Sequence, residues 1–81
     1  MVKTIFTDKF ERKFRKSDAS VKIKLKKQIQ KIIENPEIGK PMKYNRKGTR
    51  EVYVQSFRLS YSYSLKEELI IFLNIYHKDE Q

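Results

Sequence analysis

Hydrophobic residues recur at helical spacing in the first part of the chain. Phe6, Phe10 and Phe14 lie four residues apart, which predicts a helix over about residues 8–16 with an aromatic face turned towards the core. Thr7 is a typical N-cap for this helix, because its hydroxyl oxygen accepts a backbone hydrogen bond in the first turn. This first helix is therefore expected to bury its phenylalanines.

A second helix is predicted from Ser17, as its N-cap, to about Asn35. Its apolar residues fall within roughly a third of a turn when successive residues are about 100° apart; they are Val21, Leu25, Ile29, Ile32 and Ile33. Ile23 lies outside this stripe, among the lysines of the opposite face. The stretch ENPEIGKP then ends the helix, because a residue before proline disfavours helical backbone.

From residue 50 the hydrophobic period changes to two, which is typical of β-strands. Strands are predicted at residues 50–55, 58–64 and 69–77, with a tight turn or a bulge at Ser56. The last of them is apolar on both faces, which places it inside the sheet. The short, β-prone residues 2–6 predict one more strand ahead of the helices.

The order of these elements is β-α-α-β-β-β, which predicts an α+β fold and one domain over residues 1–81. A helical hairpin is expected to pack on one face of a small, mainly antiparallel sheet. The other face of the sheet is expected to stay open.

Arg58 is the residue on the open face that carries candidate chemistry. Side chains alternate along a strand, so Leu59 and two tyrosines point one way while Arg58 and three serines point the other. Arg58 is the only charged residue between Glu51 and Lys66. A guanidinium stays charged and presents a planar fork of donors that fits two phosphate oxygens.

The charge of the chain points to a polyanionic partner. The net charge is +9, but residues 1–50 hold 16 basic and 5 acidic groups, whereas residues 51–81 hold 3 and 5. Nucleic acid is the commonest polyanion for so uneven a distribution. The absence of cysteine excludes a disulfide framework, and a single histidine leaves no set of zinc ligands. No stretch suits a signal peptide or a membrane span, so we expect a cytoplasmic protein without a metal or cofactor.

Three stretches, in order, resemble a known family of bacterial toxins. They are IIENPEIGKPMK at residues 32–43, REVYVQSFRLSY at residues 50–61, and NIYHK at residues 74–78. Together they resemble the RelE/ParE toxin superfamily over nearly the whole chain. The resemblance implies a toxin that is inhibited by a cognate antitoxin. RelE-like members act on the ribosome, where they cleave mRNA through attack of a ribose 2′-hydroxyl, whereas ParE-like members inhibit DNA gyrase.

The resemblance also assigns roles to individual residues. Arg58 matches the arginine of the family's YRL pattern and is expected to hold the scissile phosphate. His77 and Lys78 match the end of the family motif and are the other candidate catalytic residues, although a solvated strand end explains them equally well. Antitoxin binding is expected at Ile23, which alternatively packs against the first helix. RNA binding is expected at Lys43, Arg46, Lys47, Arg50 and Tyr53.

The leading interpretation is thus a ribosome-dependent mRNA endoribonuclease that needs no metal. The alternative is a non-catalytic relative, either a ParE-like gyrase inhibitor or a protein that only binds an antitoxin or RNA. Three features favour this alternative: Tyr53 stands where many ribonucleases carry a cation, no tyrosine follows Lys78, and no carboxylate is clearly placed as a base. An unrelated small RNA-binding protein explains the charge but not the three ordered motifs.

Overall fold

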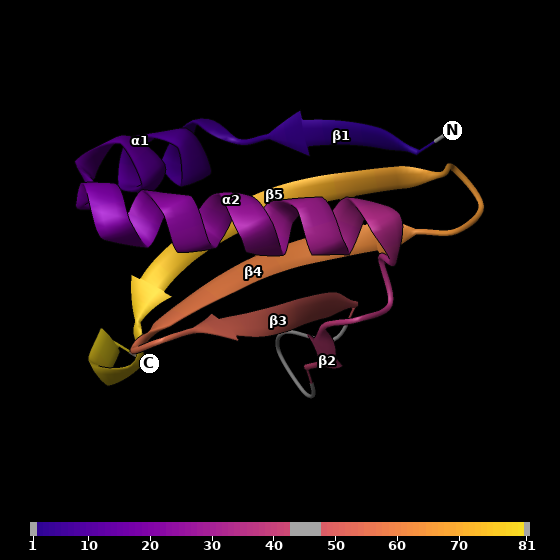
Figure 1. The fold of residues 1–81 in the computed structure, drawn as a ribbon. Helices are drawn as coiled ribbons and strands as arrows, with labels where there is room; N and C mark the ends of the chain where they lie inside the picture. The colour runs from indigo at the N-terminus through magenta and orange to yellow at the C-terminus, as the bar shows by residue number, and fades with distance from the viewer. Residues whose placement is uncertain (1, 43–47, 81) are drawn as a thin grey trace.

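Two helices and a five-stranded sheet make up the computed structural model, which describes residues 2–42 and 48–80 (Figure 1). The elements are β1 (Lys3–Phe6), α1 (Asp8–Lys16), α2 (Ala19–Glu34), β2 (Lys40–Pro41), β3 (Thr49–Val54), β4 (Phe57–Ser64), β5 (Leu69–His77) and a short 3-10 helix, η2 (Lys78–Glu80). The predicted α+β fold and the order of the predicted elements are confirmed.

The strands form one sheet in the order β1-β5-β4-β3-β2. β1 pairs with β5 in parallel, and the other pairs are antiparallel, so the sheet is mainly antiparallel as expected. β5 lies inside the sheet, in agreement with its apolar pattern. The short edge strand β2 was not predicted, because a proline within a turn-rich stretch gives no strand signal, although proline is tolerated at a sheet edge.

Both helices begin close to their expected positions, but one cap differs. Thr7 caps α1 as predicted, with its hydroxyl oxygen 3.2 Å from the backbone nitrogen of Phe10. The prediction that Ser17 caps the second helix was wrong, since Asp18 occupies that position. Ser17 instead ends α1 and donates a hydrogen bond to the carbonyl of Lys13 at 3.0 Å.

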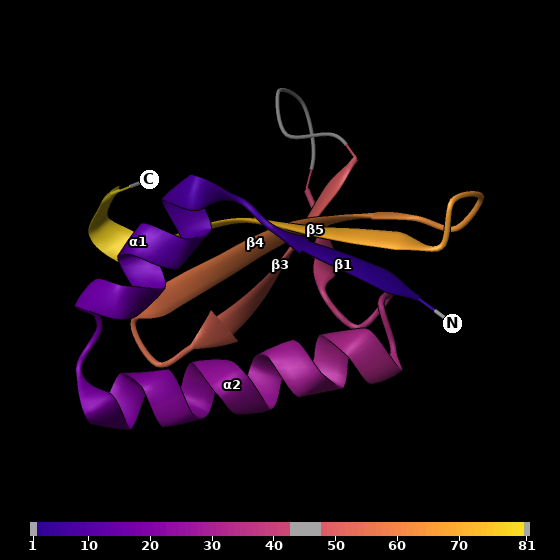
Figure 2. The same cartoon turned by 90° about the horizontal axis from the view of Figure 1, so that it is seen from above.

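The core lies between α2 and one face of the sheet. Seen from above, α2 runs along that face, while α1 lies beside the end of the sheet (Figure 2). The most deeply buried side chains come from both helices and from β4 and β5; they are Phe10, Leu25, Ile32, Leu59, Tyr61, Ile70 and Phe72. The expected aromatic and aliphatic stripes therefore meet the sheet, and they leave its other face available for function.

Tyr61 ties the loop after α2 to the centre of the sheet. Its hydroxyl donates to the carbonyl of Pro36 at 2.7 Å and accepts from the backbone N–H of Gly39 at 2.9 Å. A Cβ atom at Gly39 would lie 2.6 Å from that hydroxyl oxygen, so a larger residue would collide with it. Burial raises the pKa of Tyr61, although the Gly39 hydrogen bond and the charge of Arg50 act in the opposite direction.

Candidate functional site

Arg58 lies at the middle of a row of three side chains on the open face of the sheet. The strand register places it opposite Tyr53 of β3 and Tyr76 of β5, and residues paired in this way share a face. Its guanidinium carbon lies 3.9 Å from the centre of the Tyr53 ring. Its Nη1 atom donates to the carbonyl of Phe57 at 3.3 Å. The expected placement of Arg58 on the open face therefore holds.

A buried carboxylate lies next to this row. Glu51 pairs with Ser60, which lies two residues after Arg58 on β4 and on the same face of the sheet. Glu51 is only 4% exposed. The hydroxyl of Tyr76, itself 7% exposed, donates a hydrogen bond to the Glu51 carboxylate. Diagonal neighbours of this kind are about 7–8 Å apart in a sheet. The open face thus brings a carboxylate, a phenol and a guanidinium together.

Glu51 was missed at the level of sequence, where no carboxylate stood out as a base. The alternation of REVYV does contain the signal, because Glu51 shares a face with Tyr53 while Val52 and Val54 face the core. Glu51 is also the only acidic residue between Glu37 and Glu67. The contact of Glu51 with Tyr76 could not be predicted from this alternation, because Tyr76 belongs to another strand.

His77 lies on the other side of the sheet from Arg58. It pairs with Phe57, and the two rings meet edge to face with their centres 5.4 Å apart. Phe57 packs against the core, so the histidine faces the helices. Its Nδ1 atom accepts a hydrogen bond from the backbone N–H of Asp79 at 3.2 Å. The structure therefore does not bring His77 and Arg58 together as a pair.

Lys78 follows directly at the start of η2. Its backbone N–H donates to the carbonyl of Ser56 at 2.8 Å, which holds it beside the turn between β3 and β4. Its side chain is exposed. Of the two candidate residues at the end of β5, Lys78 is the more exposed.

The predicted RNA-binding residues divide into three groups. Tyr53 is 57% exposed on the open face. Arg50 lies on the helix-facing side, where its Nη1 atom donates to the carbonyls of Glu37 at 3.1 Å and Gly39 at 2.9 Å, which supports a role in holding the loop. The remaining three lie outside the described residues; they are Lys43, Arg46 and Lys47.

The described part of the chain contains no group of three or more His, Cys, Asp and Glu side chains that is placed to hold a metal ion. Within residues 2–42 and 48–80, neither helix has the length and apolar character needed to cross a membrane.

A family model described as the ParE toxin of the type II toxin-antitoxin system, parDE, matches residues 4–81. The chain belongs to this toxin family. The match confirms the resemblance to the RelE/ParE superfamily that the three sequence motifs indicated. A sequence comparison with curated proteins gives no match.

Solved structures of related toxins share the fold of this toxin. The Escherichia coli RelBE toxin-antitoxin complex contains a chain with a TM-score of 0.81 and 18% identity, covering 95% of this toxin and 96% of that chain. A RelBE complex from Mycobacterium tuberculosis gives 0.83 and 19%, with 94% and 96% covered. The YoeB/ParE toxin from Agrobacterium tumefaciens gives 0.82 and 17%, with 94% and 98% covered. At these identities the comparisons establish the fold alone.

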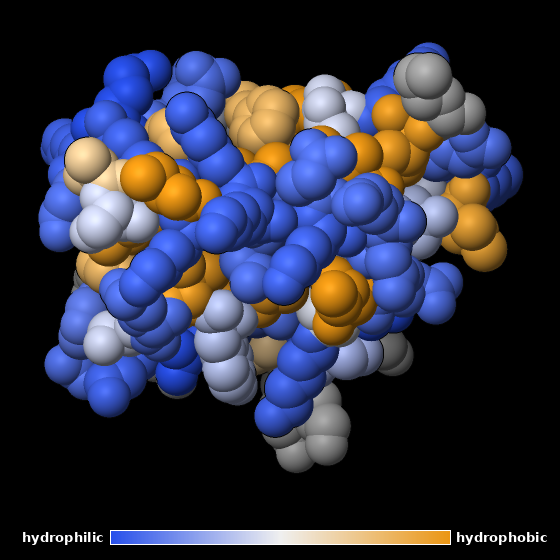
Figure 3. All heavy atoms as spheres, viewed as in Figure 1, coloured by the Kyte–Doolittle hydropathy of each residue, from blue (hydrophilic) through white to orange (hydrophobic). Residues whose placement is uncertain are grey.

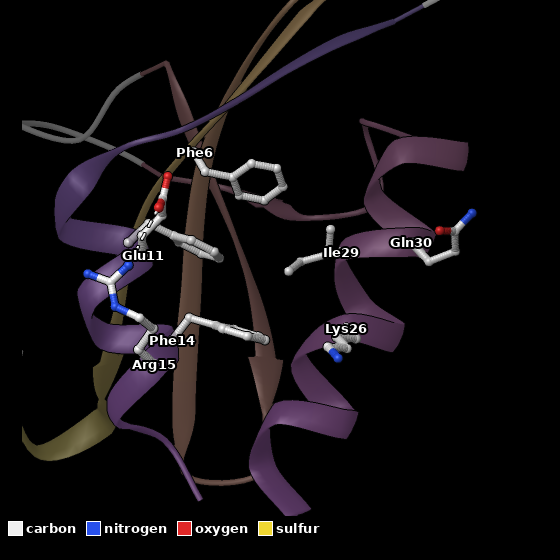
Figure 4. A pocket seen from close by; sticks show the side chains of 8 residues that line it. Phe6, Glu11, Phe14, Arg15, Lys26, Ile29 and Gln30 are labelled. Carbon is white, nitrogen blue, oxygen red and sulfur yellow. Dashed lines mark ion pairs between the residues drawn. The ribbon is translucent and has the colours of Figure 1, made fainter. Parts of the chain in front are cut away.

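The toxin also has an apolar groove between its two helices, with a volume of about 560 Å³. Phe6 and Phe14 point across it towards Ile29 of α2 (Figure 4). Its rim is charged, with Arg15 paired to Glu11 at 3.7 Å and Lys26 on the opposite helix. The surface that carries α2 is otherwise largely hydrophilic, with separate hydrophobic patches (Figure 3).

Ile23 is 58% exposed, so of the two alternatives left open by the sequence, exposure on the lysine side of α2 is the one found. It precedes Lys26 and Gln30 of the groove rim by three and seven residues, so it lies along the same side of α2. Ile23 therefore lies next to the polar rim of the groove on α2.

Proposed function

We propose that this toxin is a ribosome-dependent endoribonuclease that cleaves mRNA in the cytoplasm. The observation that supports the proposal most is the arrangement of Glu51, Arg58 and Tyr76 on the open sheet face. Cleavage through a ribose 2′-hydroxyl requires a base for that hydroxyl and donors for the charge that builds on the phosphate. A carboxylate beside a guanidinium supplies both without a metal.

In the proposed reaction Glu51 removes the proton of the 2′-hydroxyl, whose oxygen then attacks the adjacent phosphorus. Arg58 donates to the non-bridging phosphate oxygens, where charge increases in the transition state. The bond from phosphorus to the 5′-oxygen breaks, that oxygen takes up a proton from water, and Glu51 returns the proton of the 2′-hydroxyl to solvent. The products are a 2′,3′-cyclic phosphate and a free 5′-hydroxyl. Tyr76 acts as a positioning residue, because its hydrogen bond fixes the Glu51 carboxylate.

Lys78, exposed directly after β5, is proposed as a second cation that neutralises part of the developing charge. The expectation that His77 is catalytic receives no support from its contacts, because its ring packs against Phe57 on the helix side. Binding to ribosomal RNA and message is proposed to use the cations around the end of the basic half of the chain, namely Lys43, Arg46 and Lys47.

The second candidate is a ParE-like gyrase inhibitor without nuclease activity. One observation favours it: the guanidinium of Arg58 lies over the ring of Tyr53. Many ribonucleases of the superfamily carry a cation in place of this tyrosine. In this alternative the Arg58 side chain is part of a protein-binding surface, and Glu51 is a structural acid.

The cognate antitoxin is proposed to cover the groove between α1 and α2 together with Ile23. The related RelBE structures contain a toxin bound to its antitoxin. An amphipathic, acidic segment suits this surface, because its apolar side fills the groove and its charge complements Lys26 and the neighbouring lysines of α2.

Expression without antitoxin tests the proposed activity. Cells should stop growing, and mapping of RNA 5′ ends should reveal new cuts in translated message at the ribosomal A site. A parallel assay of DNA supercoiling should find gyrase active. Growth arrest with intact message and inhibited gyrase would establish the alternative instead.

A further inference from the structure

A polar cavity of about 380 Å³ lies between α1 and the open face of the sheet. Its lining combines side chains from α1, β3, β4 and β5; they are Lys9, Lys13, Thr49, Glu51, Ser60, Leu73, Asn74 and Tyr76. A volume of this size suits one small ligand. Because Glu51 and Tyr76 belong to both, the cavity is continuous with the candidate site described above.

The two lysines give the cavity a cationic wall. Lys9 and Lys13 are four residues apart on α1, so their side chains extend from the same side of the helix. Phe10 occupies a different side of α1 and inserts into the core. The helix at the end of the sheet therefore contributes to both faces, with its aromatic side to the core and its lysines to the open face.

α1 is fixed firmly enough to present these lysines at a defined position. The hydroxyl of Thr7 lies 2.9 Å from the carbonyl oxygen of Phe72 and 3.1 Å from that of Leu73, which docks the start of the helix on β5. At this point β5 has an irregular register, with Ser60 opposite Asn74 but Tyr61 opposite Phe72. The anchoring contacts thus adjoin the lining of the cavity itself.

We propose that this cavity binds the nucleotide on the 5′ side of the cleaved bond. That nucleotide carries the 2′-hydroxyl that Glu51 deprotonates, so its ribose must lie next to Glu51, and the inference rests on the proposed function to this extent. Its 3′-phosphate then lies at Arg58, and its 5′-phosphate meets Lys9 and Lys13. Ser60 and Asn74 offer hydroxyl and amide groups to the ribose and base.

A small probe tests this arrangement without ribosomes or cleavage. Adenosine 3′,5′-bisphosphate has both phosphates, whereas adenosine 3′-monophosphate lacks the one assigned to the lysines. Calorimetric titration should find that Lys9→Ala/Lys13→Ala weakens binding of the bisphosphate by about tenfold or more and leaves the monophosphate nearly unchanged. Amide resonances of Ser60 and Asn74 should shift when either compound binds to the wild type.

The matched control is Lys24→Ala/Lys27→Ala, which removes the same charge from two exposed lysines of α2 outside the cavity. It should change binding of either compound by less than about twofold. Lys9→Ala alone should show part of the effect. Because Lys9 is exposed, this single variant should fold even if replacement of the half-buried Lys13 disturbs the structure. Equal losses in the two double variants, loss of monophosphate binding as well, or no binding by the wild type would overturn the proposal.

The same variants separate this inference from the proposed reaction. If Lys9→Ala/Lys13→Ala lowers bisphosphate binding but the wild type leaves message intact, the cavity is a nucleotide site and the nuclease proposal fails. If the wild type cleaves message, and Lys9→Ala/Lys13→Ala needs no higher toxin concentration for cleavage than Lys24→Ala/Lys27→Ala, the nuclease proposal stands and the cavity inference fails.

Discussion

The hydroxyl of Tyr76 donates a hydrogen bond to the carboxylate of Glu51, and this contact joins β5 to β3 across the strand between them. Both side chains are almost fully buried. A buried carboxylate is stable only when hydrogen bonds or opposite charges compensate for its lost hydration. The contact therefore stabilises the folded protein and, in the proposed reaction, orients the Glu51 carboxylate as the base.

The exchange of Glu51 for glutamine tests its role as the base. Glu51→Gln keeps an amide oxygen that accepts the hydrogen bond from Tyr76, but it removes the group that takes the proton. The single-turnover rate on ribosome-bound message should fall by about 10²–10⁴-fold, with ribosome affinity nearly unchanged. Cleavage at the wild-type rate would show that Glu51 is a structural acid.

Removal of the Tyr76 hydroxyl tests the positioning role of that residue. Tyr76→Phe leaves the carboxylate of Glu51 without this donor, so the free energy of unfolding should fall by about 1–3 kcal/mol. Chemical denaturation measures this loss. The cleavage rate should fall by less than in Glu51→Gln, with ribosome affinity nearly unchanged. An unchanged cleavage rate would restrict Tyr76 to a structural role.

Arg58 is expected to act mainly in the transition state. Arg58→Ala should lower the single-turnover rate by on the order of 10²-fold or more, whereas ribosome affinity falls far less. Arg58→Lys should recover only part of the rate, because an ammonium lacks the two-pronged geometry. The lost contact with the Tyr53 ring should cost only about 0.5–1 kcal/mol of stability.

The control for Arg58→Ala is Arg12→Ala, which removes the same charge from an exposed position on α1. Its cleavage rate at saturating ribosome concentration should equal that of the wild type. Equal rates for both variants would contradict a catalytic role for Arg58.

His77 and Lys78 are expected to differ, although they are adjacent. His77→Ala should change the cleavage rate by less than about threefold and cost about 0.5–1.5 kcal/mol of stability through the lost contact with Phe57. Lys78→Ala should leave stability unchanged and lower the rate by about tenfold. Measurements of cleavage rate and of chemical denaturation on both variants show whether each residue contributes to catalysis or to stability. A large rate loss in a stable His77→Ala protein would make the histidine catalytic.

Ile23 provides a test of antitoxin binding. A short acidic protein is expected from the neighbouring reading frame, and Ile23→Asp should weaken its binding by about tenfold or more, through lost apolar burial and repulsion between like charges. Ile38→Asp is the matched control, since Ile38 is 46% exposed but lies outside the groove. Titrations at low and high salt should also reveal weaker binding at high salt. Equal effects of the two substitutions would place the antitoxin elsewhere.

Tyr61 should make the stability of the toxin depend on pH in the alkaline range. Burial raises the pKa of Tyr61 above its ordinary value of 10.0, so the unfolded chain loses the phenol proton at lower pH than the folded chain. The free energy of unfolding should therefore fall as the pH rises from about 10 towards the pKa of the folded state. Denaturation at several pH values measures the slope.

Tyr61→Phe should remove this part of the slope. It should also cost about 1–3 kcal/mol at neutral pH, because Gly39 loses its acceptor. Tyr63→Phe, two residues along the same strand, is the matched control for the loss of a phenol hydroxyl from β4. An alkaline slope that persists in Tyr61→Phe would assign it to other groups.

The sequence alone determined the elements and the orientation of most of their side chains. Helical spacing placed Phe10, Leu25 and Ile32 in the core, and strand alternation put Arg58 on the open face. These features depend on neighbouring residues, whose geometry is set by helical and strand periods. The family, too, was accessible, since three ordered motifs over the chain are a local property of the sequence.

The candidate site was only partly accessible in the same way. The position of Arg58 on the open face was predicted, exposure of Ile23 was one of two alternatives, and Glu51 lay within the alternation of its strand without being recognised. The side of the sheet on which His77 lies could not be predicted from the sequence. LIIFLNIYH is apolar on both faces, so the alternation of its residues does not show which of them face the helices. The pairing of Phe57 with His77 fixed it, and that pairing depends on the register of the whole hairpin.

Only the tertiary structure decided which distant residues meet. The parallel pairing of β1 with β5 and the contact of Tyr76 with Glu51 join segments that are far apart in the chain, and the short strand β2 forms only through its pairing with β3. The same holds for Lys9 and Lys13, which read as ordinary helix lysines until α1 docks beside the open face. Local periodicity fixes which way a side chain points from its own element, whereas the register of the strands and the docking of the helices fix what it meets.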